Sequence, residues 1–462
     1  MSSVIKVASE KVSAVELVAA ALEKAKKFAE YNVFTSLNEK AALAKAAEID
    51  KKIARGEKAG RLAGVPYALK DNFSSREGKT TASAKMLENY RAPITATAVK
   101  KLEDEGAIMI GRTNLDAFAH GGSTENSYFG ATANAHDKTR VAGGSSGGSA
   151  TAVALDIVPF ALGTDTGGSI RQPASFNGVY GMKPTFGAVS RYGVVAMASS
   201  TDTIGVLAQT AEDTQMLMGL LAGKDEKDTT TLDDFLAAAK SEKLKIGVIS
   251  DFMGEGVDDE VAKLTKDYIE KLKKAGHQVS EVKMPILKYA LAVYYVVVPA
   301  EVASNLSRYD GIRYGFRAKD AKTLGEIYSK SRDEGLMPEN KRRILIGNFV
   351  LSSGFFDAYY LKAQKVRTLI IKAYNEMFAK YDVLVCPVAP TPAFKIGENT
   401  SDALKMYLGD IMTVPPSLAG LPALSVPAGK TASGLPIGVQ LIGARRSDAI
   451  LMGLAAEIEG LK

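Results

Sequence analysis

The stretch Gly143-Gly144-Ser145-Ser146-Gly147-Gly148-Ser149 is the first of two glycine-flanked serine loops in this 462-residue chain. The second, Gly163-Thr164-Asp165-Thr166-Gly167-Gly168-Ser169-Ile170-Arg171, follows it closely. Glycine lets the backbone approach a reacting atom and adopt positive φ, so paired amides can point at one oxyanion while a serine oxygen stays exposed. The two loops therefore predict a nucleophile site built on serine.

A serine nucleophile needs a base, and Lys70, in the upstream stretch Gly64 to Asn72, is the candidate. The chain has only three histidines, and only His277 follows the serines in the order of an α/β-hydrolase triad. His277 comes directly after Gly276, in a pattern typical of a helix end, so we expect a structural role for it. The segment before the first loop, residues 135–140, is mostly polar, whereas a nucleophile elbow follows a buried strand.

Two other uses of such residues fit poorly. No lysine follows the glycines as in a P-loop, and no G-x-G-x-x-G opens a helix after an apolar strand. One cysteine and three scattered histidines provide no H-E-x-x-H motif and no paired-cysteine spacing, so no metal site is predicted. Serine chemistry assisted by lysine, a known variant of triad logic, is the interpretation that the residues favour.

Both loops resemble the hallmark of the amidase signature family, in which a Ser-Ser-Lys triad has a cis peptide at its middle serine. The resemblance implies that Ser169 is the nucleophile, Ser145 the bridging serine and Lys70 the general base. It implies an α/β structure, the amidase signature fold, with a mixed central β-sheet covered by helices on both faces. It also implies an oxyanion hole formed by the backbone amides of Thr166, Gly167, Gly168 and Ser169.

Such a triad requires a neutral lysine. The pKa of a free lysine is about 10.4, and burial lowers it because desolvation disfavours the ammonium form. The neighbours Pro66, Tyr67 and Leu69 predict this burial for Lys70. Asp165 and Arg171 are expected to form a structural ion pair and not to take part in the chemistry.

Other stretches resemble one subfamily, the A subunits of amidotransferases that act on glutamyl-tRNA(Gln) or aspartyl-tRNA(Asn). By this resemblance, the chain hydrolyses glutamine and supplies ammonia for the amidation of glutamyl-tRNA(Gln) by a partner subunit. The alternative is a stand-alone amidase that hydrolyses small or acyl amides; a catalytically silent scaffold is disfavoured by the intact triad. The stretches are Gly121 to Ser127, Ser190 to Gly193, Ser304 to Gly311 and Lys341 to Ile344.

The same resemblance implies which residues select glutamine. Arg343 would bind the α-carboxylate and Asp410 the α-ammonium, with Tyr294, or its neighbour Tyr295, lining the site. His120 stands near the expected pocket, where a methionine is common in the family.

The implied partners are amidotransferase B and C subunits, with tRNA reached through the complex. We expect no cofactor in this chain, and ATP and Mg²⁺ in the partner subunit.

The net charge of +6 is not concentrated in a long basic run, and one cysteine, Cys386, fits a reducing compartment. Glu16 interrupts the only apolar run near the start, and no run of 18 apolar residues occurs, so neither a signal peptide nor a membrane span is predicted. We therefore expect a cytoplasmic protein.

The order of elements predicts one amidase domain over residues 1–462. Within it we expect N-terminal helices in 1–60, the signature core with the triad in 61–222, a β-α-β unit and helical insertion in 244–380, and strands that return to the core in 381–462. Residues 223–241 are typical of a polar surface linker. The aromatic pieces Tyr294-Tyr295 and Phe355 to Tyr360 are expected in the hydrophobic core.

Overall fold

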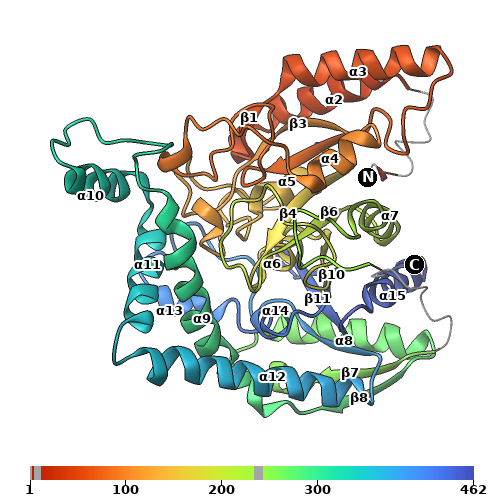
Figure 1. Ribbon diagram of the computed structural model, residues 1–462. Coiled ribbons are helices and arrows are strands. Elements are labelled where there is room, and N and C mark those ends of the chain that lie inside the picture. The colour runs from red at the N-terminus through yellow and green to blue at the C-terminus, as the bar shows by residue number, and fades with distance from the viewer. Residues whose placement is uncertain (1–2, 5–11, 234–242, 462) are drawn as a thin grey trace.

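The computed structural model describes residues 3–4, 12–233 and 243–461. An 11-stranded sheet runs through the molecule in the order β1-β3-β2-β4-β6-β5-β10-β11-β9-β7-β8 (Figure 1). Part of the predicted linker, residues 234–241, lies outside the described residues. The strands are β1 Phe34–Leu37, β2 Pro66–Lys70, β3 Ile108–Thr113, β4 Phe160–Asp165, β5 Tyr180–Lys183, β6 Thr203–Ala208, β7 Lys245–Ile249, β8 Gln278–Val282, β9 Val383–Pro387, β10 Ala423–Lys430 and β11 Pro436–Gly443.

The sheet is mixed, as predicted. Strand β2 pairs parallel with β3 and β4, and β7 pairs parallel with β8 and β9. The remaining pairs are antiparallel. Parallel neighbours bring their carboxyl ends to one edge of a sheet, which is where ligands bind in open α/β folds.

Helices cover both faces of the sheet. In β2, alternate side chains point to opposite faces: Tyr67 and Leu69 share one core cluster with α4 and α7, and Ala68 shares another with α2 and α3. The helices are α2 Ala14–Lys27, α3 Glu39–Ala54, α4 Thr97–Asp104, α5 Gly147–Ala154, α6 Arg171–Asn177, α7 Ala211–Leu221, α8 Asp259–Lys274, α9 Ala290–Asn305, α10 Leu324–Gly335, α11 Pro338–Leu351, α12 Lys362–Phe378, α13 Ala403–Leu408, α14 Val414–Leu418 and α15 Asp448–Gly460.

Several predicted elements are confirmed. Helix α2 is one of the expected N-terminal helices, and Ser13 and Glu16 form a capping box at its start. The β-α-β unit is present as β7, α8 and β8, with β7 and β8 parallel. These segments were predictable because their signals, a cap or an apolar period, are local.

One apolar helical stretch, Pro285–Arg308, is long enough by length and composition to cross a membrane, with a mean hydropathy of 1.5. Of the 18-residue window of this stretch that meets the criterion, 56% is buried inside the protein. Val293, Val297 and Val302 of its central helix α9 belong to a core cluster. The stretch is therefore a core helix of this fold.

The prediction that the aromatic segment Phe355 to Tyr360 is core was wrong. Tyr294 is buried, but Phe355, Phe356 and Tyr359 are 40%, 38% and 44% exposed. They lie at the 101° bend between α11 and α12, in and beside the π-helix η7 (Phe356–Leu361). The rings of Phe355 and Tyr359 pack on each other and on Phe349, and these contacts leave both rings partly exposed to solvent.

Candidate active site

Lys70 is the last residue of β2, at the carboxyl edge of the sheet. Because β2 and β4 are parallel neighbours, this edge also holds Thr164, near the end of β4. The Lys70 Nζ donates to Thr164 Oγ1 at 2.8 Å, to Ser146 Oγ at 2.8 Å and to Ser145 Oγ at 2.9 Å. The structure thus brings the predicted lysine and bridging serine into direct contact.

The two serine loops are tied together by their backbones. The Ser146 N–H donates to the Ser169 carbonyl at 3.0 Å, and the peptide between Gly144 and Ser145 is cis, as the resemblance implied. Lys70 and Ser145 are fully buried, whereas Ser169 keeps 9% of its surface exposed. Of the three predicted triad residues, Ser169 is therefore the one with exposed surface.

The environment of Lys70 favours the neutral amine. Burial lowers the pKa of Lys70 to about 7, although the negative charges of Asp116, Asp165 and Asp202 oppose the shift. The predicted cause, desolvation, is the largest one. Near pH 7 a substantial fraction of Lys70 is therefore unprotonated and able to accept a proton.

Asp165 gives the second serine loop its shape. Its carboxylate forms the expected buried ion pair with Arg171, at 2.9 Å, and accepts the backbone N–H of Ile170 at 3.1 Å. It also accepts the Gly168 N–H at 2.9 Å. The Gly168 amide, predicted as an oxyanion donor, is therefore already occupied, because it fixes the loop to its own aspartate. Within the part of the chain that the structure describes, the amides of Gly167 and Ser169 donate to no other group.

Two side chains from the C-terminal half press on this loop. Thr413 Oγ1 donates to the Gly167 carbonyl at 2.6 Å. A methyl group added at Gly167 would lie 2.6 Å from the Tyr294 hydroxyl oxygen, and one added at Gly168 would lie 2.3 Å from Thr413 Oγ1. The loop has no room for a side chain at either position, which accounts for its glycines.

A cavity of about 270 Å³ contains the other predicted site residues. Arg343 and Asp410 both line it, as do the backbones of Gly121 and Gly122. Tyr295 lines the cavity and donates to Asp410 at 3.4 Å, whereas Tyr294 packs on Gly167. The predicted lining role therefore falls to Tyr295, and Tyr294 supports the serine loop.

Burial shifts the pKa values of two titratable groups in or near this cavity, Asp410 and His120. Burial raises the pKa of Asp410 to about 7, although the guanidinium of Arg343 pulls it down. His120 is fully buried; burial first, and then the charge of Arg343, lower its pKa to about 3. His120 is thus neutral at physiological pH and adds no positive charge beside the cavity.

The other candidate base, His277, has a structural place. Its Nδ1 accepts the Leu244 N–H at 3.1 Å, and its Nε2 lies 3.3 Å from Glu457. It therefore joins the start of β7 to helix α15. The contacts of this histidine are accounted for without the serine loops.

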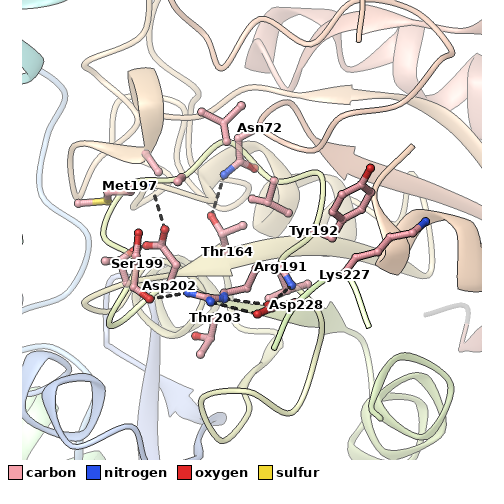
Figure 2. A pocket seen from close by; sticks show the side chains of 16 residues that line it. Asn72, Thr164, Arg191, Tyr192, Met197, Ser199, Asp202, Thr203, Lys227 and Asp228 are labelled. Atoms are coloured by element: carbon pink, nitrogen blue, oxygen red, sulfur yellow. Dashed lines mark hydrogen bonds and ion pairs between the residues drawn. The ribbon is translucent and has the colours of Figure 1, made fainter. Parts of the chain in front are cut away.

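Thr164 also lines a second cavity, of about 240 Å³ (Figure 2). Asn72 lines it and donates through Nδ2 to Thr164 Oγ1 at 3.1 Å, the same oxygen that holds Lys70. Arg191 and Asp228, 3.0 Å apart, line another part of it. The cavity is thus in contact with the lysine through one shared hydroxyl.

Several residues of the site escaped prediction. Ser146 and Thr164 hold the Lys70 Nζ. Gln172 accepts the Gly144 N–H at 2.9 Å and donates to the Gly122 carbonyl at 2.8 Å, which links two loops. The first two lie inside the quoted serine loops and could have been singled out there; Gln172 carries no sequence signal of its own.

Comparison with known proteins agrees with this geometry. A family model described as Amidase matches residues 16–452. The A subunit of a glutamyl-tRNA(Gln) amidotransferase from Thermosynechococcus vestitus is 51% identical over 432 residues, 92% of this chain and 90% of the relative. The protein of the same name from Carboxydothermus hydrogenoformans is 49% identical over 461 residues, 98% of this chain and 95% of the relative.

Solved structures give the same result. The crystal structure of the glutamyl-tRNA(Gln) amidotransferase A subunit from Thermotoga maritima is 39% identical, with a TM-score of 0.83 over 99% of this chain and 94% of that one. A bacterial aryl acylamidase of the amidase signature family is 25% identical, with a TM-score of 0.86 over 99% of this chain and 96% of that one. The fold, the two serine loops and these matches agree: the chain belongs to the amidase family.

Proposed function

We propose that this chain is the glutamine-hydrolysing A subunit of an amidotransferase that amidates glutamyl-tRNA(Gln). The observation that carries the proposal is the contact of Lys70 with Ser145, 2.9 Å apart and fully buried. It occurs in a chain about 50% identical, over more than nine-tenths of its length, to relatives that bear this name.

The proposed reaction uses three side chains. Neutral Lys70 takes the proton of Ser145, and Ser145 takes that of Ser169 as the Ser169 Oγ attacks the amide carbon of glutamine. A C–O bond forms, and the C–N bond breaks when the relay returns a proton to the nitrogen, which leaves as ammonia. Water then hydrolyses the glutamyl ester by the reverse relay, and glutamate leaves.

The oxyanion of each tetrahedral intermediate needs preorganised donors. We assign this role to the amides of Thr166, Gly167 and Ser169. Gly168 is left out because its N–H is bound to Asp165. The support from Tyr294 and Thr413 keeps the loop in place without a contribution from substrate.

Glutamine selection is assigned to the 270 Å³ cavity. The guanidinium of Arg343 suits the α-carboxylate, because an arginine fork matches carboxylate geometry. Asp410, in contact with the Tyr295 hydroxyl, suits the α-ammonium. An ammonium in the site would favour the charged form of Asp410, whose pKa burial raises to about 7 in the free protein.

The proposal places the chain in a cytoplasmic complex. Amidotransferase B and C subunits would be its partners, and tRNA would be reached through them. ATP and Mg²⁺ enter only at the partner subunit, where ammonia attacks an activated glutamyl group. The three side chains named above need no cofactor for the hydrolytic half of the reaction.

The alternative is a stand-alone amidase. Its support is that amidases with other names have TM-scores as high as the Thermotoga protein. Identity separates the two candidates: about 50% to the amidotransferase subunits, against 32% and 25% to an amidase and an aryl acylamidase of known structure. We therefore favour the amidotransferase role.

Ammonia release from glutamine and from a panel of simple amides tests the proposal, with Ser169→Ala as the blank. We expect glutamine-selective turnover that rises when partner subunits and glutamyl-tRNA(Gln) are added. Vigorous hydrolysis of aliphatic or aryl amides that ignores the partners would establish the stand-alone amidase instead.

A further inference from the structure

Glu339 lines the cavity assigned to glutamine. It is the second residue of α11, and its carboxylate accepts three donors. These are the Arg343 Nε at 2.9 Å, the Tyr407 hydroxyl at 2.8 Å and an amino group of Arg342. One carboxylate thus joins two helices, α11 and α13, that both line the cavity.

The bond to Glu339 fixes the direction of Arg343. A guanidinium donates from Nε and from two terminal amino groups in a rigid plane. Nε is held by Glu339, and the cation lies 5.3 Å from the ring centre of Tyr295 and 5.8 Å from that of Tyr407. Arg343 is only 3% exposed, yet it lines the cavity. Among the described residues, no hydrogen-bond partner occupies its terminal amino groups.

The local charge suits an anion. Two guanidinium groups, of Arg342 and Arg343, surround the single carboxylate of Glu339. On the face of α11 that lines the cavity, positive charges therefore outnumber negative charges by one, and neutral His120 does not add to them; the carboxyl groups of Asp116, Glu125 and Asp410 line other parts of the cavity. Glu339 holds the arginine without cancelling the charge that would attract a carboxylate.

We propose that Glu339 is a positioning residue that directs the terminal fork of Arg343 into the cavity and so sets the preference for amides with an α-carboxylate. The inference rests on the proposed function, because it takes glutamine as the substrate. Glu339 acts through its hydrogen bonds with Arg343 and with the Tyr407 hydroxyl, and it takes no part in the making or breaking of bonds in the substrate.

Two amides that each lack one group of glutamine provide the test. 4-Aminobutanamide lacks the α-carboxylate, and glutaramate lacks the α-amine. In the assembled complex, Glu339→Ala should raise the KM for glutamine and for glutaramate about 10- to 100-fold, the value of a charge-assisted hydrogen bond. The kcat for both, and kcat/KM for 4-aminobutanamide, should stay close to wild type. Glu339→Gln keeps an acceptor oxygen and should fall between Ala and wild type.

Glu334→Ala is the matched control, because it removes an exposed carboxylate that pairs with Lys85 at 3.1 Å. Equal losses for all three amides in Glu339→Ala, or an unchanged KM for glutamine, would overturn the inference while leaving the proposed function intact. A wild-type complex that hydrolyses 4-aminobutanamide as well as glutamine would overturn both. A wild-type enzyme that prefers glutaramate to glutamine would refute glutamine as substrate, and the Glu339 variants would still report on the carboxylate.

Discussion

The floor of the site and its outer wall are built in different ways. The floor consists of Lys70 at the end of a buried strand and of two loops whose shape is held mainly by backbone groups and by Asp165. The wall consists of long side chains on helices α9, α11 and α13 and of Asp410 just after α13, and these side chains hold one another. Glu339 and Tyr407, for example, are 68 positions apart in the chain, and Tyr295 and Asp410 are 115 apart.

The difference separates chemistry from recognition. A floor built from the backbone and glycines admits almost no substitution, because each added atom meets a neighbour. In a wall built from paired side chains, one side chain of a pair can be substituted while the helices that carry the pair stay folded. We therefore expect variants of the floor to lose kcat and variants of the wall to lose affinity for the substrate.

The largest effect is expected from Ser169→Ala. Without its Oγ no acyl-enzyme can form, and turnover should fall on the order of 10⁶-fold, as in serine hydrolases that lose their nucleophile. Ammonia release from glutamine measures it. Ser329→Ala, an exposed serine that donates to the Gly325 carbonyl in its own helix, should keep full activity. If Ser169→Ala retained a tenth of wild-type activity, the nucleophile would have to be sought elsewhere.

Lys70→Ala should lower kcat on the order of 10⁴-fold through loss of the base. The chain offers a matched control in Lys183, which is also fully buried and whose pKa is also lowered to about 7 by burial. Lys183 donates to the carbonyls of Leu421 and Pro184 and not to serines. Lys183→Met should therefore lower the thermal unfolding midpoint while the catalytic step continues. Equal losses of kcat in both variants would contradict the special role of Lys70.

Gly167→Ala should lower kcat about a hundredfold, the effect of disturbing one oxyanion donor. The added methyl would lie 2.6 Å from the Tyr294 hydroxyl oxygen, so the loop must move. Tyr294→Ala in the same chain should restore part of the loss by making room. Single-turnover kinetics with glutamine follow both, and a Gly167→Ala variant with wild-type kcat would show that the loop tolerates the shift.

The smallest effect is the pH dependence of kcat/KM, about tenfold per pH unit for one group. The pKa of Lys70 is lowered to about 7, so the base is neutral above that pH and protonated below it. The pKa of Asp410 is raised to about 7, so its charge for the α-ammonium is lost as the pH falls through the same range. Activity should thus rise through pH 7 and level off above it.

Glutaramate separates these two groups, because it has no ammonium for Asp410 to bind. Below pH 7 the logarithm of kcat/KM for glutaramate should fall with a slope of about one, and that for glutamine with a slope approaching two. Identical slopes for the two amides would remove Asp410 from ammonium binding.

The floor of the site was largely predictable from sequence, and the wall was not. Ser145, Ser169 and Lys70 lie in continuous motifs, and the structure places Lys70 Nζ 2.9 Å from the Ser145 Oγ. The engagement of the Gly168 amide by Asp165 could not be inferred from those motifs, because it depends on how the loop folds back on its own aspartate.

In the wall, no motif singles out Glu339, and the resemblance did not decide whether Tyr294 or Tyr295 lines the cavity. Neighbouring positions on α9 point in different directions, and only the packing against α11 and α13 decides which ring faces the cavity. The exposed Phe355 and Tyr359 show the same limit, since an aromatic run does not reveal the bend that turns it outward.

The placement of the wall on α11 and α13 has a consequence for the history of the family. Tyr295 and the residues between positions 338 and 410, which would choose the substrate, lie far along the chain from the serine loops, so one part can mutate while the other is retained. An aryl acylamidase and a 6-aminohexanoate cyclic dimer hydrolase, each 25% identical to this chain, keep the architecture with TM-scores of 0.86 and 0.85. New specificities can thus evolve by substitutions on these helices within an inherited architecture.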